Sequence, residues 1–123
     1  METNIEDLLL DLIKVNGVER VALINIIKKE VKYGFNLDDN SRPLVQAMSD
    51  IVRTNIKYAR LSSLKNHFED ILITYSDGIH LLTSFSYIRN HFFYIGIDKS
   101  SNIALTRRKL NECLSVCFNT PVL

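Results

Sequence analysis

Hydrophobic positions follow a helical period in three segments of the chain and strand-like patterns in the segments between them. The first predicted helix runs from Asn4 to Val15, because Thr3 to Glu6 has the form of a capping box and Asn16-Gly17 is a typical helix end. The second predicted helix runs from Arg42 to Arg60, and the third from Ser101 to Phe118. All three are longer than the 4–8 residues typical of a buried strand.

Strands are predicted where β-branched and aromatic residues cluster between turn signals, at Val18–Ile27, Val31–Phe35, Phe68–Tyr75, Ile79–Tyr87 and Phe92–Ile97. Both alternating sets of positions are apolar in the first strand, which is typical of a strand covered on both faces. Asp77-Gly78 is a strong hairpin signal between the third and fourth strands. The order α-β-β-α-β-β-β-α predicts an α+β fold in which helices sandwich a five-stranded antiparallel sheet. We expect residues 1–123 to form a single domain.

The predicted helix Arg42–Arg60 has more apolar surface than one core face requires. Its apolar residues on a helical wheel are Leu44, Val45, Ala47, Met48, Ile51, Val52, Ile56, Tyr58 and Ala59. The polar residues of the other side are Gln46, Ser49, Asp50, Arg53, Thr54, Lys57 and Arg60. The apolar arc spans roughly half of the circumference, whereas a single core-facing stripe needs ~100°. We therefore expect the helix to pack against two surfaces, its own sheet and a second one.

Composition and charge exclude several classes of protein. The chain has 123 residues, with 15 Lys plus Arg and 14 Asp plus Glu, so its formal net charge is +1. This balance argues against a nucleic-acid backbone or an acidic membrane as the main partner. Cys113 and Cys117 have a helical spacing that suits a disulfide poorly, and the acidic N-terminus is unlike a signal peptide. No apolar run approaches the ~20 residues of a membrane span, so we expect a cytoplasmic protein.

The sequence gives little support to catalysis, a metal site or a cofactor. It contains no G-x-S-x-G, no glycine-rich phosphate loop, no C-x-x-C and no H-E-x-x-H. His67, His80 and His91 are scattered along predicted strands, and we expect them to be polar residues of the surface or of a sheet edge. Glu69 and Asp70 are neighbours in a strand and therefore point to opposite faces. We expect a protein that is not an enzyme and needs no cofactor.

Arg107, Arg108 and Lys109 form the densest basic cluster of the chain. The simpler interpretation is a solvated start of the last helix, and the alternative is a contact with a phosphate or an acidic partner. The alternative leaves open a nucleic-acid accessory role, which the balanced net charge disfavours.

Together, the order of elements and several short motifs resemble the roadblock, or dynein light-chain-7, domain family. The matching features are Asn16-Gly17-Val18, the long central helix, the Asp77-Gly78 hairpin, the strand Phe92–Ile97, and the run from Asn102 to Arg107 that opens the last helix. The resemblance covers about Ile5 to Phe118. The sequence departs from the family at Lys28-Lys29-Glu30 and at Leu61-Ser62-Ser63, since the family usually has a glycine in each turn.

The resemblance implies a dimeric regulatory or scaffold module that binds a small Ras-like GTPase. Roadblock domains pair through the central helix and the third strand, with a second copy or with a paralogous chain. The residues expected at such an interface are Met48, Ile51, Val52, Asn55, Ile56, Ile71 and Ile73. Asn55 has two interpretations, a polar group that fixes the register of pairing or an ordinary exposed helix residue.

Two other functions remain open from the sequence. The first is a small-molecule sensor of the PAS or profilin-like kind, which needs a cavity lined by Phe85, Tyr87, Phe93 and Tyr94. The alternative for these aromatic residues is a packed core. The second is a purely structural subunit of a larger assembly.

Overall fold

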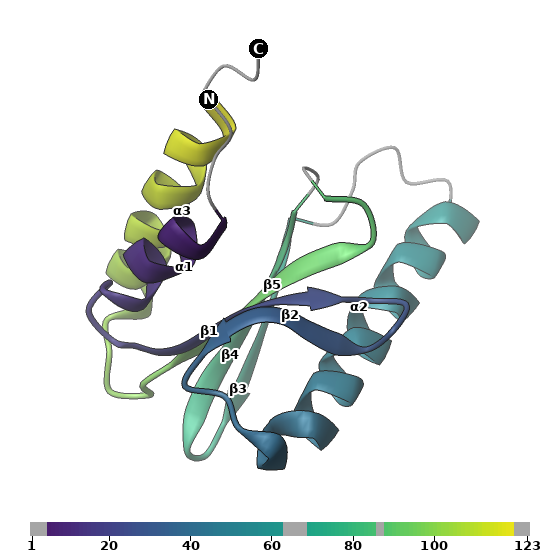
Figure 1. Ribbon diagram of the computed structural model, residues 1–123, viewed down its shortest axis with the longest axis horizontal. Coiled ribbons are helices and arrows are strands. Elements are labelled where there is room, and N and C mark those ends of the chain that lie inside the picture. Colours follow the sequence, from purple (N-terminus) through teal and green to yellow (C-terminus); the bar gives the residue numbers. More distant parts are fainter. Residues whose placement is uncertain (1–4, 63–68, 86–87, 120–123) are drawn as a thin grey trace.

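The computed structural model describes residues 5–62, 69–85 and 88–119, with side chains described as far as residue 115 of the last helix. In chain order the elements are α1 (Ile5–Ile13), β1 (Val18–Asn25), β2 (Glu30–Phe35), the short 3-10 helix η1 (Asp39–Ser41), α2 (Arg42–Leu61), β3 (Asp70–Tyr75), β4 (Gly78–Ser84), β5 (His91–Ile97) and α3 (Ile103–Asn119) (Figure 1). The predicted order of helices and strands is confirmed. The capping box at Thr3 and the strand residues Phe68 and Tyr87 lie outside the described residues.

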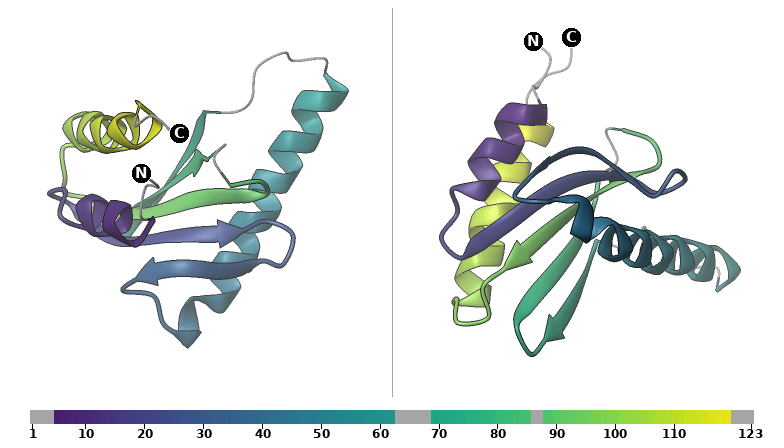
Figure 2. Two further views of the ribbon diagram at one scale, coloured as in Figure 1. Left: turned by 45° about the horizontal axis from the view of Figure 1, so that its top comes forward. Right: turned by 60° about the horizontal axis from the view of Figure 1, so that its bottom comes forward.

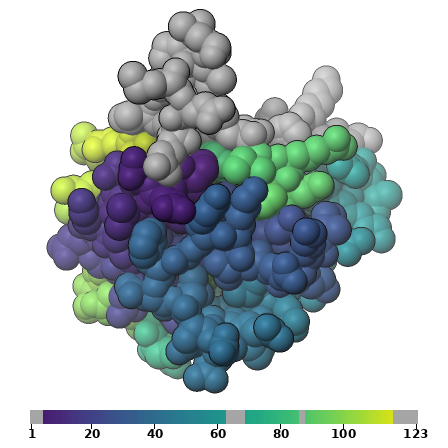
Figure 3. All heavy atoms as spheres, viewed as in Figure 1, coloured from purple at the N-terminus to yellow at the C-terminus, as the bar shows by residue number. Residues whose placement is uncertain are grey.

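The five strands form one sheet in the order β2-β1-β5-β4-β3, and every neighbouring pair is antiparallel. The strands β2 and β3 are therefore the two edges. Figure 3 shows the molecule from the side on which the β1–β2 hairpin lies between α1 and α2. The fold class predicted from the sequence is confirmed.

Helices cover both faces of the sheet (Figure 2). Val21 and Leu23 of β1 belong to a core that includes Leu9 of α1 and Leu110 of α3. The intervening residue Ala22 belongs to a second core, built with α2 on the opposite face. The two apolar sets that alternate along β1 therefore each meet a different layer of helix, as expected for a strand covered on both faces.

Gly17 joins α1 to β1 with a backbone φ of +94°, where residues with a side chain are strained. A Cβ atom at this position would lie 2.2 Å from the Ser101 hydroxyl oxygen. The carbonyl of Gly17 accepts a hydrogen bond of 2.8 Å from the Asp98 amide. The turn that ends α1 is thus fastened to the turn that precedes α3, which holds the two helices of this layer together.

Both hairpin turns differ in detail from the sequence prediction. In the first, Glu30 was expected in the turn but already begins β2, and Lys29 has a φ of +56°, the left-handed conformation that glycine adopts most readily. The Asn25 side chain stabilises this turn by accepting from the amides of Ile27 and Lys28, at 2.9 and 3.0 Å. In the second, the strands were predicted to join around Ser76-Asp77-Gly78; Ser76 and Asp77 form the turn, whereas Gly78 already pairs with Tyr75 and begins β4.

Candidate interaction surface on α2 and β3

The first half of α2 is fixed on its own sheet. Val45, Met48 and Val52 are buried in the core that α2 forms with β1, β4 and β5. Met48 and Val52, at 1% and 0% exposure, were predicted to contact a second chain. That assignment is corrected, because both side chains already lie against their own sheet and present no surface to a partner.

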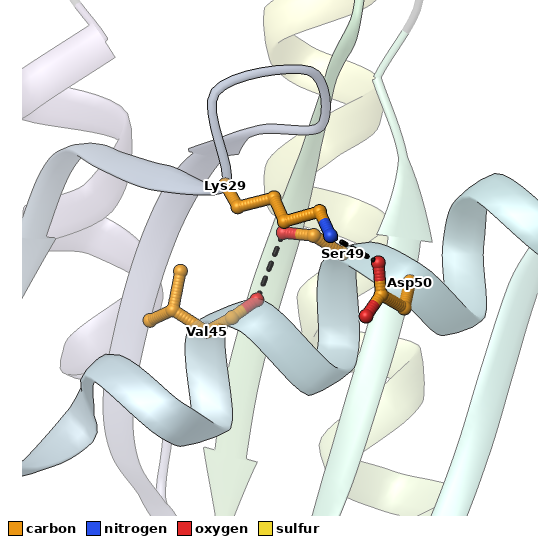
Figure 4. Close-up of polar contacts among 4 residues, drawn as sticks. All are labelled: Lys29, Val45, Ser49 and Asp50. Atoms are coloured by element: carbon orange, nitrogen blue, oxygen red, sulfur yellow. Dashed lines mark hydrogen bonds and ion pairs between the residues drawn. The ribbon is translucent and has the colours of Figure 1, made fainter.

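Ser49 is a second correction on this helix, because it was assigned to the polar side and is fully buried. Its hydroxyl donates a hydrogen bond of 2.8 Å to the Val45 carbonyl one turn earlier (Figure 4). A serine that satisfies its hydroxyl on its own helix can be buried at little cost. A helical-wheel analysis that counts every serine as polar misses this possibility.

One flank of α2 carries side chains at helical spacing that its own sheet does not fully bury. The apolar Ile51 is half-buried, the polar Asn55 is exposed, and Tyr58 is 65% exposed. Leu61, at the end of the helix, is 75% exposed, but it follows Asp50 by eleven residues and therefore lies about 20° from it around the helix, outside this flank. No residue after Val52 is fully buried in this helix, so its second half has apolar surface that its own sheet does not cover.

The other flank of α2 is polar and faces the first hairpin. The Lys29 ammonium lies 2.7 Å from a carboxylate oxygen of Asp50, and Figure 4 shows it reaching from the β1–β2 turn to the helix. Ile51 and Tyr58 lie about 100° and 80° around the helix from Asp50, and Ile51 packs against the same core as Ile71 and Ile73 of β3.

The strand β3 is an edge, and only one of its sides pairs with a described strand. The Ser84 amide donates to the Glu69 carbonyl, so by antiparallel alternation Ile71, Ile73 and Tyr75 also direct their backbone groups at β4. The backbone groups of the intervening residues, Leu72 among them, consequently face outward. This arrangement is a template for a further strand.

The side chains of β3 extend the apolar surface of α2. Ile71 and Ile73 are half-buried and pack against the same core as the partly buried Ile51 and Ile56. Tyr75 is 43% exposed at the end of the strand. We call the exposed or half-buried part of these two elements the α2–β3 face, and its members are Ile51, Asn55, Ile56, Tyr58, Ile71, Ile73 and Tyr75.

Asn55 points into solvent and donates a hydrogen bond of 2.9 Å to the Ile51 carbonyl. This is how an exposed helix residue bonds, and it leaves the amide oxygen free for a partner. Tyr58 was not among the predicted interface residues, although the apolar arc predicted for this helix contains it.

The three basic residues of α3 do not act as one cluster. An Arg107 guanidinium nitrogen donates to a carboxylate oxygen of Asp70 at 2.5 Å, which ties α3 to the start of β3. Arg108 lies 3.6 Å from Glu112 on an exposed helix surface, and Lys109 is exposed. Arg107 and Arg108 line a surface hollow of about 620 Å³ along α3.

The aromatic residues that a sensor would need do not share a cavity. Phe85 and Phe93 are packed against each other, 4.6 Å between ring centroids, in the core beneath α1 and α3. Tyr94 belongs to the opposite core, beneath α2. Tyr87 lies outside the described residues.

The histidines also differ from the expectation that all three are surface or edge residues. His80 is 7% exposed, so for this residue the expectation was wrong. His91 is half-buried, and its Nδ1 lies 2.8 Å from the Arg89 carbonyl oxygen. His67 lies outside the described residues. Within the described ranges no three His, Cys, Asp or Glu side chains are grouped for a metal ion, and no helix is both long and apolar enough to cross a membrane.

Comparisons with known proteins establish the class of fold. No family profile and no curated protein sequence matches the chain. The chain has the roadblock/LC7 fold, since a roadblock/LC7 domain from Streptomyces avermitilis matches with a TM-score of 0.74 at 9% identity, over 93% of this chain and 94% of that one.

Structures of MglB proteins are similar to the chain in the same way. MglB of Myxococcus xanthus has a TM-score of 0.74 at 12% identity, covering 97% of this chain and 100% of its own. The gliding protein MglB of Thermus thermophilus has a TM-score of 0.67 at 12% identity, covering 91% and 86%. At these identities the likeness confirms the predicted fold.

Proposed function

We propose that this chain is a non-enzymatic dimeric regulatory or scaffold module of the cytoplasm that binds a small Ras-like GTPase. The observation that carries the proposal is the α2–β3 face, where an apolar helix flank lies beside an unpaired strand edge. The resemblance to roadblock domains supplies the class of partner.

Dimerisation follows from the physical character of the α2–β3 face. A second copy that adds its own β3 beside the first would satisfy the outward backbone groups of both edges. The same approach would cover the apolar flanks of both α2 helices, including Tyr58, and large aromatic residues contribute strongly to interfaces. One solved structure with the same fold is described as MglB with a tetrameric arrangement, which supports association through this fold.

Two substitutions on opposite flanks of α2 test the dimer surface. Tyr58→Lys places a charge within the proposed interface, and Gln46→Lys places the same charge on the exposed flank that faces the first hairpin. We expect Tyr58→Lys to raise the dimer dissociation constant about tenfold or more, in the range of interface hot spots. Gln46→Lys is expected to leave it unchanged. Equal effects of the two substitutions in analytical ultracentrifugation would contradict the assignment.

The GTPase partner is tested by capture followed by a nucleotide test. The tagged chain is used as bait in a lysate of its source organism, and any small GTPase recovered is purified and loaded with GDP or with a non-hydrolysable GTP analogue. We expect an affinity that depends on the nucleotide. A dimer that binds no small GTPase in either state would favour the purely structural subunit.

The contact surface for the GTPase is tested with charge reversals at exposed basic residues. Arg108→Glu and Lys109→Glu on α3 are compared with Lys32→Glu on β2. Arg107 is excluded from this comparison because it holds Asp70. Weaker GTPase binding by the two α3 variants alone would support the predicted partner contact. Equal binding by the two α3 variants and the β2 variant would contradict that prediction.

A further inference from the structure

A buried polar cluster lies on the α2 side of the sheet, among the apolar side chains of that core. The His80 Nδ1 and the Tyr94 hydroxyl lie 2.5 Å apart, and their rings are stacked with centroids 5.3 Å apart. His80 is 7% and Tyr94 1% exposed. The Arg20 side chain lies over Gly96 beside them, because a Cβ at Gly96 would fall 2.8 Å from Arg20 Nε and 3.0 Å from the Tyr94 hydroxyl.

The direction of the hydrogen bond follows from the available partners. Tyr94 O–H has His80 as its hydrogen-bond partner in the described part of the chain, so it donates to a neutral imidazole. Burial lowers the pKa of His80, the Arg20 guanidinium lowers it further, and Asp77 acts in the opposite direction. Burial also raises the pKa of Tyr94 to about 12, so its proton stays in place at neutral pH. The neutral histidine thus carries its own proton on Nε2.

The cluster is connected directly to the edge strand. His80 pairs with Ile73 of β3 in the sheet register. The Tyr75 ring, at the end of β3, meets the His80 ring edge-on at a centroid distance of 4.9 Å. His80 is therefore the backbone partner of one residue of the α2–β3 face, Ile73, and its ring contacts that of another, Tyr75.

We propose that the His80–Tyr94 pair is an acid-sensitive lock on β3, so that protonation of His80 loosens this edge and weakens pairing of two chains through it. The second half of this statement rests on the proposed dimer. A protonated imidazole has no acceptor at Nδ1, so the buried Tyr94 O–H loses the group to which it donates. The new positive charge also lies near Arg20.

The charged and titratable groups around His80 come from each neighbouring strand. They are Arg20 of β1, Tyr75 of β3, Asp77 of the β3–β4 turn and Tyr94 of β5. The α2 residues packed on this core are the apolar Val45, Met48 and Val52. Asp77 is the one group here that favours the charged histidine, and its effect ranks below those of burial and Arg20.

The expected pH dependence has a definite sign. The pKa of His80 in the folded chain lies below its ordinary value of 6.5, so the unfolded or opened state binds the proton more readily. The closed edge is therefore stable above pH 6.5 and loses stability as the pH falls from 6.5 toward the lowered pKa. Protons favour the opened edge throughout this window.

Two measurements at pH 8.0 and pH 5.0 test the lock. Amide hydrogen exchange, corrected for intrinsic rates, follows the Ile71 and Ile73 amides that face β4, with Leu23 in the middle of the sheet as an internal reference. Analytical ultracentrifugation follows the dimer dissociation constant. In the wild-type chain we expect the protection of the β3 amides to fall, and the dissociation constant to rise, by about fivefold or more at pH 5.0, the lower end of typical coupling between two sites.

Variants assign the effect to the lock. His80→Asn keeps an acceptor at nearly the same place and cannot titrate, so it is expected to remove the pH dependence. His91→Asn and His67→Asn are expected to keep it. Tyr94→Phe is a second test if His80→Asn does not fold, because without the buried O–H the protonation of His80 costs less and the pH dependence shrinks.

The outcomes separate the lock from the dimer. If the β3 amides lose protection in acid only when His80 is present, but the chain is a monomer at every pH, the lock stands and the dimer fails. If a dimer forms and neither measurement changes with pH, the lock is overturned. A pH dependence that persists unchanged in both His80→Asn and Tyr94→Phe overturns it as well.

Discussion

The buried hydroxyl of Ser49 illustrates how this fold accommodates polar atoms one residue at a time. Its bond to the Val45 carbonyl satisfies it within α2, without a partner from the sheet. The Asn25 side chain acts similarly in the first hairpin, where it accepts from two amides of its own turn. Local bonds of this kind stabilise a turn or allow a polar atom to be buried at little cost.

Replacing Ser49 with alanine should change the free energy of unfolding by less than about 1 kcal/mol. The lost bond is local, and alanine is a better helix former by about 0.5 kcal/mol. Ser49→Asp should cost about 3 kcal/mol or more, because a carboxylate would be buried without a partner. Urea unfolding at one fixed protein concentration measures both. An alanine variant destabilised by more than about 2 kcal/mol would show that the hydroxyl supports more than its own turn.

Lys29 holds a left-handed backbone conformation that β-branched residues tolerate badly. We expect Lys29→Val to destabilise the chain by about 1–2 kcal/mol more than Lys28→Val, which is made in the same turn at a residue without a positive φ. Asp50→Asn measures how much of the destabilisation by Lys29→Val comes from losing the Lys29–Asp50 ion pair. The contribution of this ion pair to the free energy of unfolding should be below about 1 kcal/mol, because both partners are partly exposed. Equal unfolding midpoints for the two valine variants would contradict the explanation.

Ser49 and His80 show which properties of single residues could not be predicted from the sequence. Ser49 was assigned to the polar side of the helix because of its residue type, which does not reveal that its hydroxyl bonds to its own helix. His80 was expected at a surface or edge because the histidines are scattered along predicted strands, whereas in the folded chain its Nδ1 contacts the hydroxyl of Tyr94 of β5, 14 residues away in the sequence. Contacts of this kind are set by the register of the sheet.

At the scale of elements, the connection between α1 and β1 depends on Gly17. We expect Gly17→Ala to destabilise the chain by about 2 kcal/mol or more, since it combines a positive φ with a clash against Ser101. Gly78→Ala is the matched control, because its Cβ would lie at an ordinary 3.5 Å from the Ile97 carbonyl oxygen. Thermal unfolding of the two variants side by side makes the comparison. If Gly17→Ala melts at the temperature of Gly78→Ala, the connection is more adaptable than the structure indicates.

The elements themselves were predictable because their patterns are local. The apolar period of α2 and the double apolar set of β1 follow from the positions of side chains along a helix and a strand. Which part of the wide arc of α2 meets the sheet was not predictable, and Met48 and Val52 were assigned to the wrong side for that reason. The packing of Val45, Met48 and Val52 against β1, β4 and β5 sets the rotation of the helix, and these contacts join residues far apart in the sequence.

At the scale of the whole molecule, the two edges of the sheet differ in the way that the proposed function requires. The edge β3 lies beside the apolar flank of α2, whereas the Lys29–Asp50 ion pair lies on the β1–β2 side of the same helix. An apolar face next to unpaired backbone groups is costly to leave in water, and a second copy is the occupant that we propose. The near-zero net charge of the chain offers little electrostatic resistance to such association.

The mass of the chain in solution tests this account most directly. Sedimentation equilibrium over about 1–100 µM, at a pH between 7.5 and 8, should give a species of twice the 14.2 kDa of one chain. Tyr58→Lys in the same buffer should shift the mass toward that of one chain. A folded wild-type protein of 14.2 kDa at every concentration would contradict the proposal that the α2–β3 face pairs two copies.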